Sequence, residues 1–210
     1  MKESTLTISL QTSPKEHASL VALQHAFAEL CNALVPIVRQ NRCWNRVGLH
    51  HLAYHSLRAR FPRMGSQMVC NAIYSVSRAY RMVPKQPESP LPYLQFTPGA
   101  PVFFDRHTVS IKEKQISMYS LDGRIRFGCH CPQEIMDVFS HGKIREIVLH
   151  RNNETFSMSF IVQETEAAER GAQDTPGELP EYIVLLPDSA AEEHLSPTAP
   201  STNLTEPVEA

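Results

Sequence analysis

Glycine is scarce in this sequence, with eight residues among 210, and the glycine-dependent signatures of several enzyme classes are missing. The patterns GxxxxGK, GxGxxG and GxSxG do not occur, which excludes the usual phosphate-binding loops and the serine nucleophile of α/β-hydrolases. His51 and His55 have the spacing of metal ligands on a helix, but the glutamate of an HExxH motif does not accompany them. No pair of carboxylates for metal-dependent hydrolysis is indicated either. The sequence therefore predicts neither an enzyme nor a cofactor.

Cysteine is also scarce, and its number is odd. An odd count without regular spacing favours free thiols in a reducing cytoplasm over a disulfide framework. The cluster Cys129-His130-Cys131 is the most metal-like group, but a structural zinc site normally has a second ligand pair, and none lies nearby in the sequence. We therefore expect no bound metal. The five cysteines are Cys31, Cys43, Cys70, Cys129 and Cys131.

Long apolar runs are missing as well. We find no run of the roughly 18–20 apolar residues that cross a bilayer. The charged first segment, MKESTLTISLQTSPKE, lacks the apolar stretch of a signal peptide. With 42% apolar residues, the chain is nevertheless long enough to bury a core. We expect a cytoplasmic globular protein that does not enter a membrane.

Acidic residues are absent between Glu29 and Glu88, whereas nine lysines and arginines and three histidines lie in that window. Residues 1–163 carry 19 Lys and Arg against 11 Asp and Glu, a net charge of +8, and residues 164–210 carry one against 11, a net charge of −10. The overall charge of −2 is therefore a cancellation of two opposite halves. A long stretch with charge of one sign indicates a polyanionic partner.

The spacing of apolar residues predicts three helices in the first half. Ser13 followed by Pro14, with Glu16 three residues on, is typical of a helix start. This first helix is expected to kink or end near Pro36. A second helix is predicted from about Asn45 to Pro62, and a third from residues 65–66 to about 84. Their expected inward residues are Leu20, Leu23, Phe27, Leu30, Leu34, Val38, Leu49, Leu52, Leu57, Phe61, Val69, Ile73, Val76, Ala79 or Tyr80, and Val83.

Alternating apolar residues predict strands in the rest of the chain. One strand precedes the helices, at 4–10, and six more follow a proline-rich crossover at 84–101. The fold class is therefore α+β, a small antiparallel β-barrel (residues 1–12 and 90–163) with a helical bundle (13–89) inserted after its first strand. Residues 164–210 are expected to form a mostly disordered acidic tail, with one isolated strand at 181–187. The six later strands are predicted at 101–105, 107–113, 115–121, 123–129, 143–151 and 155–163, with hairpin turns at 122–123 and 152–153.

The basic residues on the helices are the main candidates for a binding site. Arginine side chains can contact phosphates and release counterions, and interleaved aromatic side chains can stack on bases or ribose. Core packing is the alternative for each aromatic, and it is favoured for Tyr80, which follows the apolar stripe. The candidate nucleic-acid-binding residues are Arg42, Trp44, Arg46, Arg58, Arg60, Arg63, Arg78, Arg81, Lys85, Arg124 and Arg126.

The run NRVGLHHLAYHSLRARFPRMGSQMVCNAIYSVSRAYR (45–81) resembles a stretch of the TnpB-type transposon-encoded proteins, the relatives of type V CRISPR effectors. In that family a Tyr-x-x-Leu-Arg helix is followed by a Gln-containing helix that ends in Ala-Tyr-Lys. The segments PVFFDRHTVSI, SLDGRIRF and KIREIVLHRNNETFSMSFIV resemble the strands that follow in the family, so the resemblance covers residues 4–163. The matching positions are Tyr54, Leu57, Arg58, Phe61, Gln67, Val76, Ala79, Tyr80 and Arg81.

The resemblance implies the wedge and recognition parts of a TnpB-like RNA-guided protein, which hold a guide RNA scaffold and the guide–target heteroduplex. The RuvC-like nuclease half of the family has no counterpart in this sequence. Asp188 stands near the place of the first catalytic aspartate, but it lacks the flanking glycines and the later acids. Nuclease activity is therefore not implied, and the chain resembles a truncated relative.

The leading hypothesis is a non-catalytic protein that binds structured RNA or an RNA–DNA heteroduplex. The alternatives are a protein-interaction subunit or inhibitor that acts with a separately encoded RuvC-like nuclease or a type V effector, and a decayed transposon remnant. The acidic tail is expected either to compete with nucleic acid for the basic helices or to serve as a solubilising segment.

Overall fold

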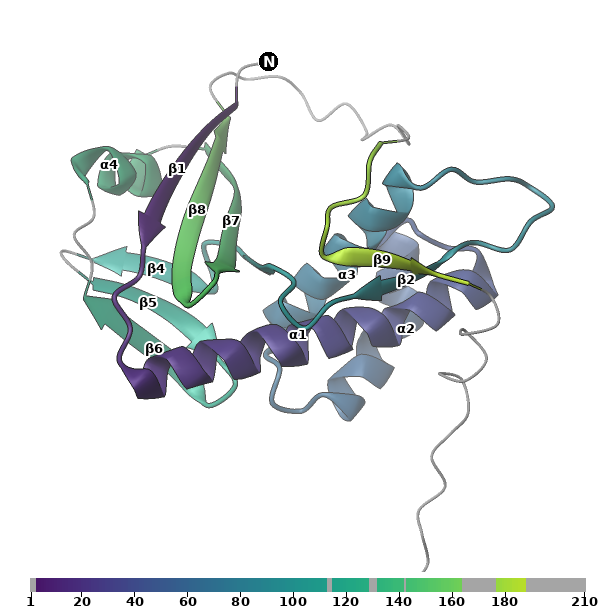
Figure 1. Cartoon of the computed structure of the whole chain (residues 1–210), viewed down its shortest axis with the longest axis horizontal. Coiled ribbons are helices and arrows are strands. Elements are labelled where there is room, and N and C mark those ends of the chain that lie inside the picture. The colour runs from purple at the N-terminus through teal and green to yellow at the C-terminus, as the bar shows by residue number, and fades with distance from the viewer. Residues whose placement is uncertain (1–2, 113–114, 129–131, 142, 164–176, 188–210) are drawn as a thin grey trace, which may run out of the picture.

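The computed structural model describes residues 3–112, 115–128, 132–141, 143–163 and 177–187 (Figure 1). Four helices and nine strands lie in these residues, and the chain is mixed α and β as the sequence predicts. The helices are α1 (Pro14–Asn41), α2 (Arg46–Arg60), α3 (Ser66–Met82) and α4 (Gln133–His141). The strands are β1 (Glu3–Ser9), β2 (Tyr93–Phe96), β3 (Val102–Phe104), β4 (Val109–Lys112), β5 (Gln115–Ser120), β6 (Gly123–Gly128), β7 (Lys143–Asn152), β8 (Thr155–Gln163) and β9 (Ile183–Leu186).

The start of α1 follows the predicted capping sequence. The Ser13 hydroxyl accepts a hydrogen bond from the Glu16 amide at 3.4 Å, and the Ser13 amide donates to the Glu16 carboxylate at 2.8 Å. The hydrogen bonds from Ser13 also lower the pKa of Glu16. The helix was expected to kink or end near Pro36; it does not end there, because α1 continues to Asn41 and is capped by Arg42, which has a left-handed φ of 47°.

The boundaries of α2 and α3 agree with the prediction. The Asn45 side chain caps α2 by accepting from the amides of Val47 and Gly48 at 2.9 and 3.2 Å. Most of the expected inward residues of the three helices are buried. Leu52 is a correction, since 48% of its surface is exposed and it lies on the outer face of α2.

The strands are antiparallel, but the described ones form three open sheets and not the predicted closed barrel. The order of the first sheet is β1-β8-β7-β3, so the strand that precedes the helices pairs with the strand at the end of the second half. The pairing of β3 with β7 covers only three residues, Val102–Phe104. A turn at Asp105 then directs the chain into the separate sheet β4-β5-β6. The backbone amides of His107 and Thr108 hold this turn by donating hydrogen bonds to the Asp105 carboxylate.

Two elements differ from the sequence prediction. Helix α4 stands where we assigned no element, and Ile135 is its buried residue. Strand β9 was expected to be isolated within the tail, but it pairs antiparallel with β2 from Tyr93↔Leu186 to Phe96↔Ile183. Residues 177–187 thus belong to the fold, whereas the rest of the predicted tail and the Cys129–Cys131 cluster lie outside the described residues.

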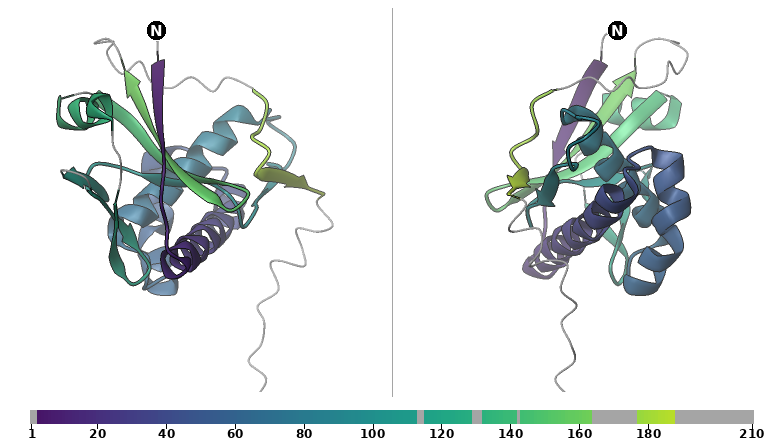
Figure 2. Two further views of the ribbon diagram at one scale, coloured as in Figure 1. Left: turned by 60° about the vertical axis from the view of Figure 1, so that its left-hand side comes forward. Right: turned by 90° about the vertical axis from the view of Figure 1, so that its right-hand side faces the viewer.

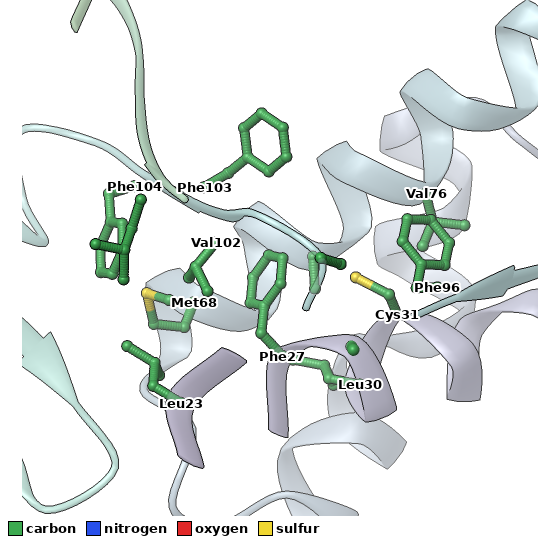
Figure 3. Packing of buried hydrophobic residues seen from close by; sticks show 14 of the residues in the cluster. Leu23, Phe27, Leu30, Cys31, Met68, Val76, Phe96, Val102, Phe103 and Phe104 are labelled. Carbon is green, nitrogen blue, oxygen red and sulfur yellow. The ribbon is translucent and has the colours of Figure 1, made fainter. Parts of the chain in front are cut away.

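One hydrophobic cluster joins the helices to the sheets. Figure 3 shows side chains of α1, α3 and β2 and Val102 of β3 gathered around Phe27 and Cys31, whereas Phe103 points to the other side of β3. Burial raises the pKa of the Cys31 thiol, which keeps it neutral in this core. By length and composition α1 could cross a membrane, with a mean hydropathy of 1.4, but 56% of that window is buried inside the fold. Polar residues interrupt the apolar ones in this window, so it is not a continuous apolar run in the sequence.

The pairing of β9 with β2 predicts how two truncations differ in stability. A chain that ends at residue 163 loses the burial of Ile183, which we expect to cost about 2 kcal/mol and to lower the melting temperature by roughly 4–8 °C. A chain that ends at Pro187 keeps β9 and should melt within about 1 °C of the full chain. Thermal unfolding followed by circular dichroism measures both. Equal melting temperatures for the two truncations would contradict a structural role for β9.

Candidate nucleic-acid interface

Helices α2 and α3 contain no acidic residue, and they carry half of the ten predicted basic residues. Arg46 is the first residue of α2 and Arg60 the last, so they lie about 21 Å apart along the helix axis. In the right-hand view of Figure 2, α2 lies at one side of the molecule and the β2–β9 ribbon at the other. The outer face of α2 is therefore left open to a partner.

Four basic residues form a strip along α3, which we call the α3 strip (Arg46, Arg78, Arg81 and Lys85). Tyr74, Arg78 and Arg81 follow one another at steps of four and three, so they share one side of α3. Lys85 lies beyond the end of the helix, and its ammonium donates to the Arg81 carbonyl at 3.3 Å. Arg46 joins them from α2, because its guanidinium lies 5.5 Å from the centre of the Tyr74 ring.

A buried carboxylate anchors the α3 strip to the sheet. Glu146 of β7 is 5% exposed and accepts hydrogen bonds from the Tyr74 hydroxyl and from Arg78, both at 2.7 Å. The backbone of β7 is irregular between Ile144 and Glu146, where the register with β8 shifts. Burial, followed by the hydrogen bond to Glu146, raises the pKa of Tyr74 and keeps its hydroxyl a donor. Arg78 is therefore a structural residue as well as a candidate contact.

Arg42 and Lys85 hold the proline-rich segment beside the end of α1. The Arg42 guanidinium donates to the carbonyls of Ser89 at 2.8 Å and Gln86 at 3.1 Å. The Lys85 ammonium lies 5.1 Å from the centre of the Trp44 ring. Trp44 is half-buried and its carbonyl accepts from Ser77, so this residue packs against α3 and is not presented as a free stacking platform.

The turn that follows α2 contacts the β5–β6 hairpin. Arg63 pairs with Asp122 at 2.6 Å, with both side chains exposed, so this ion pair contributes little to stability. Arg58 donates to the Met64 carbonyl, and Arg60 lies 5.4 Å from the centre of the Phe61 ring. The contact between the turn and the hairpin brings the basic end of α2 close to the β4-β5-β6 sheet.

Within the described part of the chain, two of the eleven predicted residues form ion pairs, Arg63 and Arg78. Arg42, Arg58 and Arg124 donate to uncharged groups, which uses N–H donors but leaves the positive charge uncompensated. The other predicted cations are Arg46, Arg60, Arg81, Lys85 and Arg126, and three of them, Arg46, Arg60 and Lys85, lie over aromatic rings.

The aromatic candidates divide between core and surface. Tyr80 is fully buried and donates to the Pro92 carbonyl, which confirms the prediction that it packs in the core. Tyr54 stacks on His50, with ring centres 4.6 Å apart. The residue that sequence reasoning missed is Glu146, whose burial depends on the irregular register of β7 and leaves no signal in the alternation of apolar residues.

The described residues hold no group of three or more His, Cys, Asp and Glu side chains arranged to bind a metal ion. The sequence of this chain matches no protein-family model and no curated protein.

The anchoring of Glu146 predicts that two arginines on the same helix face differ in their effect on stability. Arg78→Ala removes a partner of a buried carboxylate, so the free energy of unfolding should fall by about 2 kcal/mol. Arg81→Ala removes a side chain without a comparable buried partner and should change it by less than about 0.5 kcal/mol. Urea denaturation measures both values.

A second substitution, Glu146→Gln, should recover part of the loss in the Arg78→Ala background because it removes the buried charge. If Arg78→Ala and Arg81→Ala were equally harmless, Glu146 would not anchor the strip.

Proposed function

We propose that this chain is a non-catalytic protein that binds structured RNA or an RNA–DNA heteroduplex through the outer side of α2 and the α3 strip. The observation that carries the proposal is the pair of helices without any acidic residue, whose arginines are exposed or half-buried at the surface. A protein without a polyanionic partner has no physical reason to avoid carboxylates over so long a surface.

The geometry supports contacts to phosphates more than contacts to base edges. The cations are arginines spread over both ends of α2, and several are already oriented by an aromatic ring or a carbonyl. Oriented cations lose little side-chain freedom when they meet a phosphate, and each contact releases a counterion. Such an interface recognises the shape of a duplex, which is how double-stranded RNA is mostly recognised.

The resemblance to TnpB-type proteins supports the same proposal from the sequence side. The first strand pairs with β8, and the helices α1–α3 lie in the sequence between β1 and β3, the two outer strands of one sheet. An order of strand, helices and further strands is what the resemblance to a wedge with inserted recognition helices implies. In this proposal the cytoplasm is the compartment, with Cys31, Cys43 and Cys70 as free thiols.

Charge reversals test the proposal at residues whose loss does not disturb the fold. We expect Arg46→Glu, Arg60→Glu and Arg81→Glu each to weaken binding of an RNA duplex of about 16 base pairs by roughly tenfold at low salt. The neutral variants Arg46→Gln and Arg81→Gln should each lower the slope of log affinity against log salt by about one. Fluorescence anisotropy with a labelled duplex measures both.

Lys15→Glu is the matched control, because it makes the same charge change on the exposed first turn of α1, outside the α3 strip. Its effect on affinity should stay below about twofold. If Lys15→Glu weakened binding as much as the other reversals, net charge and not this interface would explain the affinity.

One observation favours the second candidate function, a subunit or inhibitor that acts with a separately encoded nuclease or type V effector. Val184 and Leu185 of β9 are 42% and 53% exposed, and among the described strands β9 pairs with β2 alone. An exposed apolar edge strand is a typical docking point for another chain. Retention of an RNA-free protein partner that is lost in a Leu185→Asp variant would favour this function over the first.

A further inference from the structure

The three-stranded sheet β4-β5-β6 has one buried and one exposed face. Ile116, Met118 and Phe127 point into the core, and the residues between them in each strand point outward. We call the outward side the open sheet face (Ser110, Lys112, Ser117, Tyr119, Arg124 and Arg126). Its composition is basic and polar with one large aromatic ring, and Tyr119 is 40% exposed.

The Arg124 side chain lies across this face from one edge strand to the other. From β6 it donates to the Ser117 hydroxyl and carbonyl of β5, both at 3.0 Å, and to the Ser110 hydroxyl of β4 at 3.2 Å. Its guanidinium carbon also lies 4.7 Å from the centre of the Tyr119 ring. Because neutral groups hold the guanidinium in place, it keeps its full charge and is fixed before any ligand arrives.

Two further cations lie on the same face, away from the hairpin turn. Arg126 of β6 is opposite Ser117, and Lys112 of β4 is opposite Gln115, so they stand two and four residues along β5 from Tyr119. The face itself carries no carboxylate among the described residues, and the nearby Asp122 in the hairpin turn is paired with Arg63. The open sheet face is therefore positively charged, with an exposed ring at its hairpin end.

We propose that the open sheet face is a second binding surface, specific for a single-stranded segment of RNA. A base stacks on the Tyr119 ring beside the Arg124 guanidinium, and Arg126 and then Lys112 contact successive phosphates of the strand as it runs along the sheet away from the hairpin. Aromatic rings with adjacent cations bind unpaired bases in this way, whereas a base inside a duplex has no free face to stack. The inference rests on the proposed function and adds to it, since α2 and the α3 strip take the duplex part of the same RNA.

The chemistry favours a nucleic acid over an acidic protein as the occupant. An acidic peptide would satisfy the cations but would leave the exposed phenol ring of Tyr119 without a matching partner. A nucleotide supplies both a phosphate and a π-face at neighbouring positions of one chain, which matches the cations and the ring together.

The experiment compares two probes, a labelled oligouridylate of about 12 nucleotides and an RNA duplex of about 16 base pairs. Tyr119→Ala should weaken binding of the oligouridylate by about tenfold or more and leave duplex affinity within about twofold. Tyr119→Phe keeps the ring and should bind both probes like the parent. Since Tyr119 is exposed, its variants should melt at nearly the parental temperature, which circular dichroism checks.

The outcomes separate this inference from the function on which it rests. If Tyr119→Ala binds the oligouridylate like the parent while Arg81→Glu still loses the duplex, the open sheet face is not a site and the duplex interface remains. If neither variant changes binding of either probe, both proposals fail. If Tyr119→Phe loses as much as Tyr119→Ala, the hydroxyl and not stacking is responsible, and the stacking inference is overturned.

Discussion

The Glu146 carboxylate, held by Tyr74 and Arg78, is the interaction on which the basic surface depends. It connects the polar side of α3 to β7 and so fixes the helix against the sheet. Asn71 of the same helix donates to the Phe103 carbonyl at 3.0 Å and strengthens this connection. Because α3 is held in this way, its cations stay on one side and Arg46 of α2 aligns with them through the Tyr74 ring.

The arrangement uses one negative charge to position several positive ones. Glu146 is buried, and its charge is compensated by Arg78 at 2.7 Å, so the pair adds little net charge to the surface. The exposed face thus remains basic although its anchor is ionic. A similar arrangement occurs at the β5–β6 hairpin. Asp122 pairs with Arg63 there, and the neighbouring Arg124 donates hydrogen bonds only to neutral groups. In both places one carboxylate forms a short ion pair with one arginine, and a neighbouring arginine keeps an uncompensated positive charge.

The sequence predicts the local structure of this chain well and its long-range structure incompletely. Helix caps and apolar stripes depend on neighbours within a few residues, so the predicted helix starts and buried faces agree with the structure. Examples are the caps Ser13 and Asn45 and the stripe from Leu20 to Val38. The closed barrel, the free β9 and the buried Leu52 were wrong because each depends on pairing or packing between distant segments. The candidate cations could be predicted from the charge pattern. Which of them is held by a buried carboxylate, as Arg78 is, could not be predicted without knowing where Glu146 lies in the fold.

The most direct test of the central claim is to purify the protein from its native host and sequence the RNA that accompanies it. The account predicts one structured RNA species, enriched to about one molecule per protein, that is lost as salt is raised because the contacts are to phosphates. Recovery of random fragments, or of protein free of RNA at low salt, would contradict it. The basic helices would then face an acidic protein surface, and the polypeptides that co-purify would identify it.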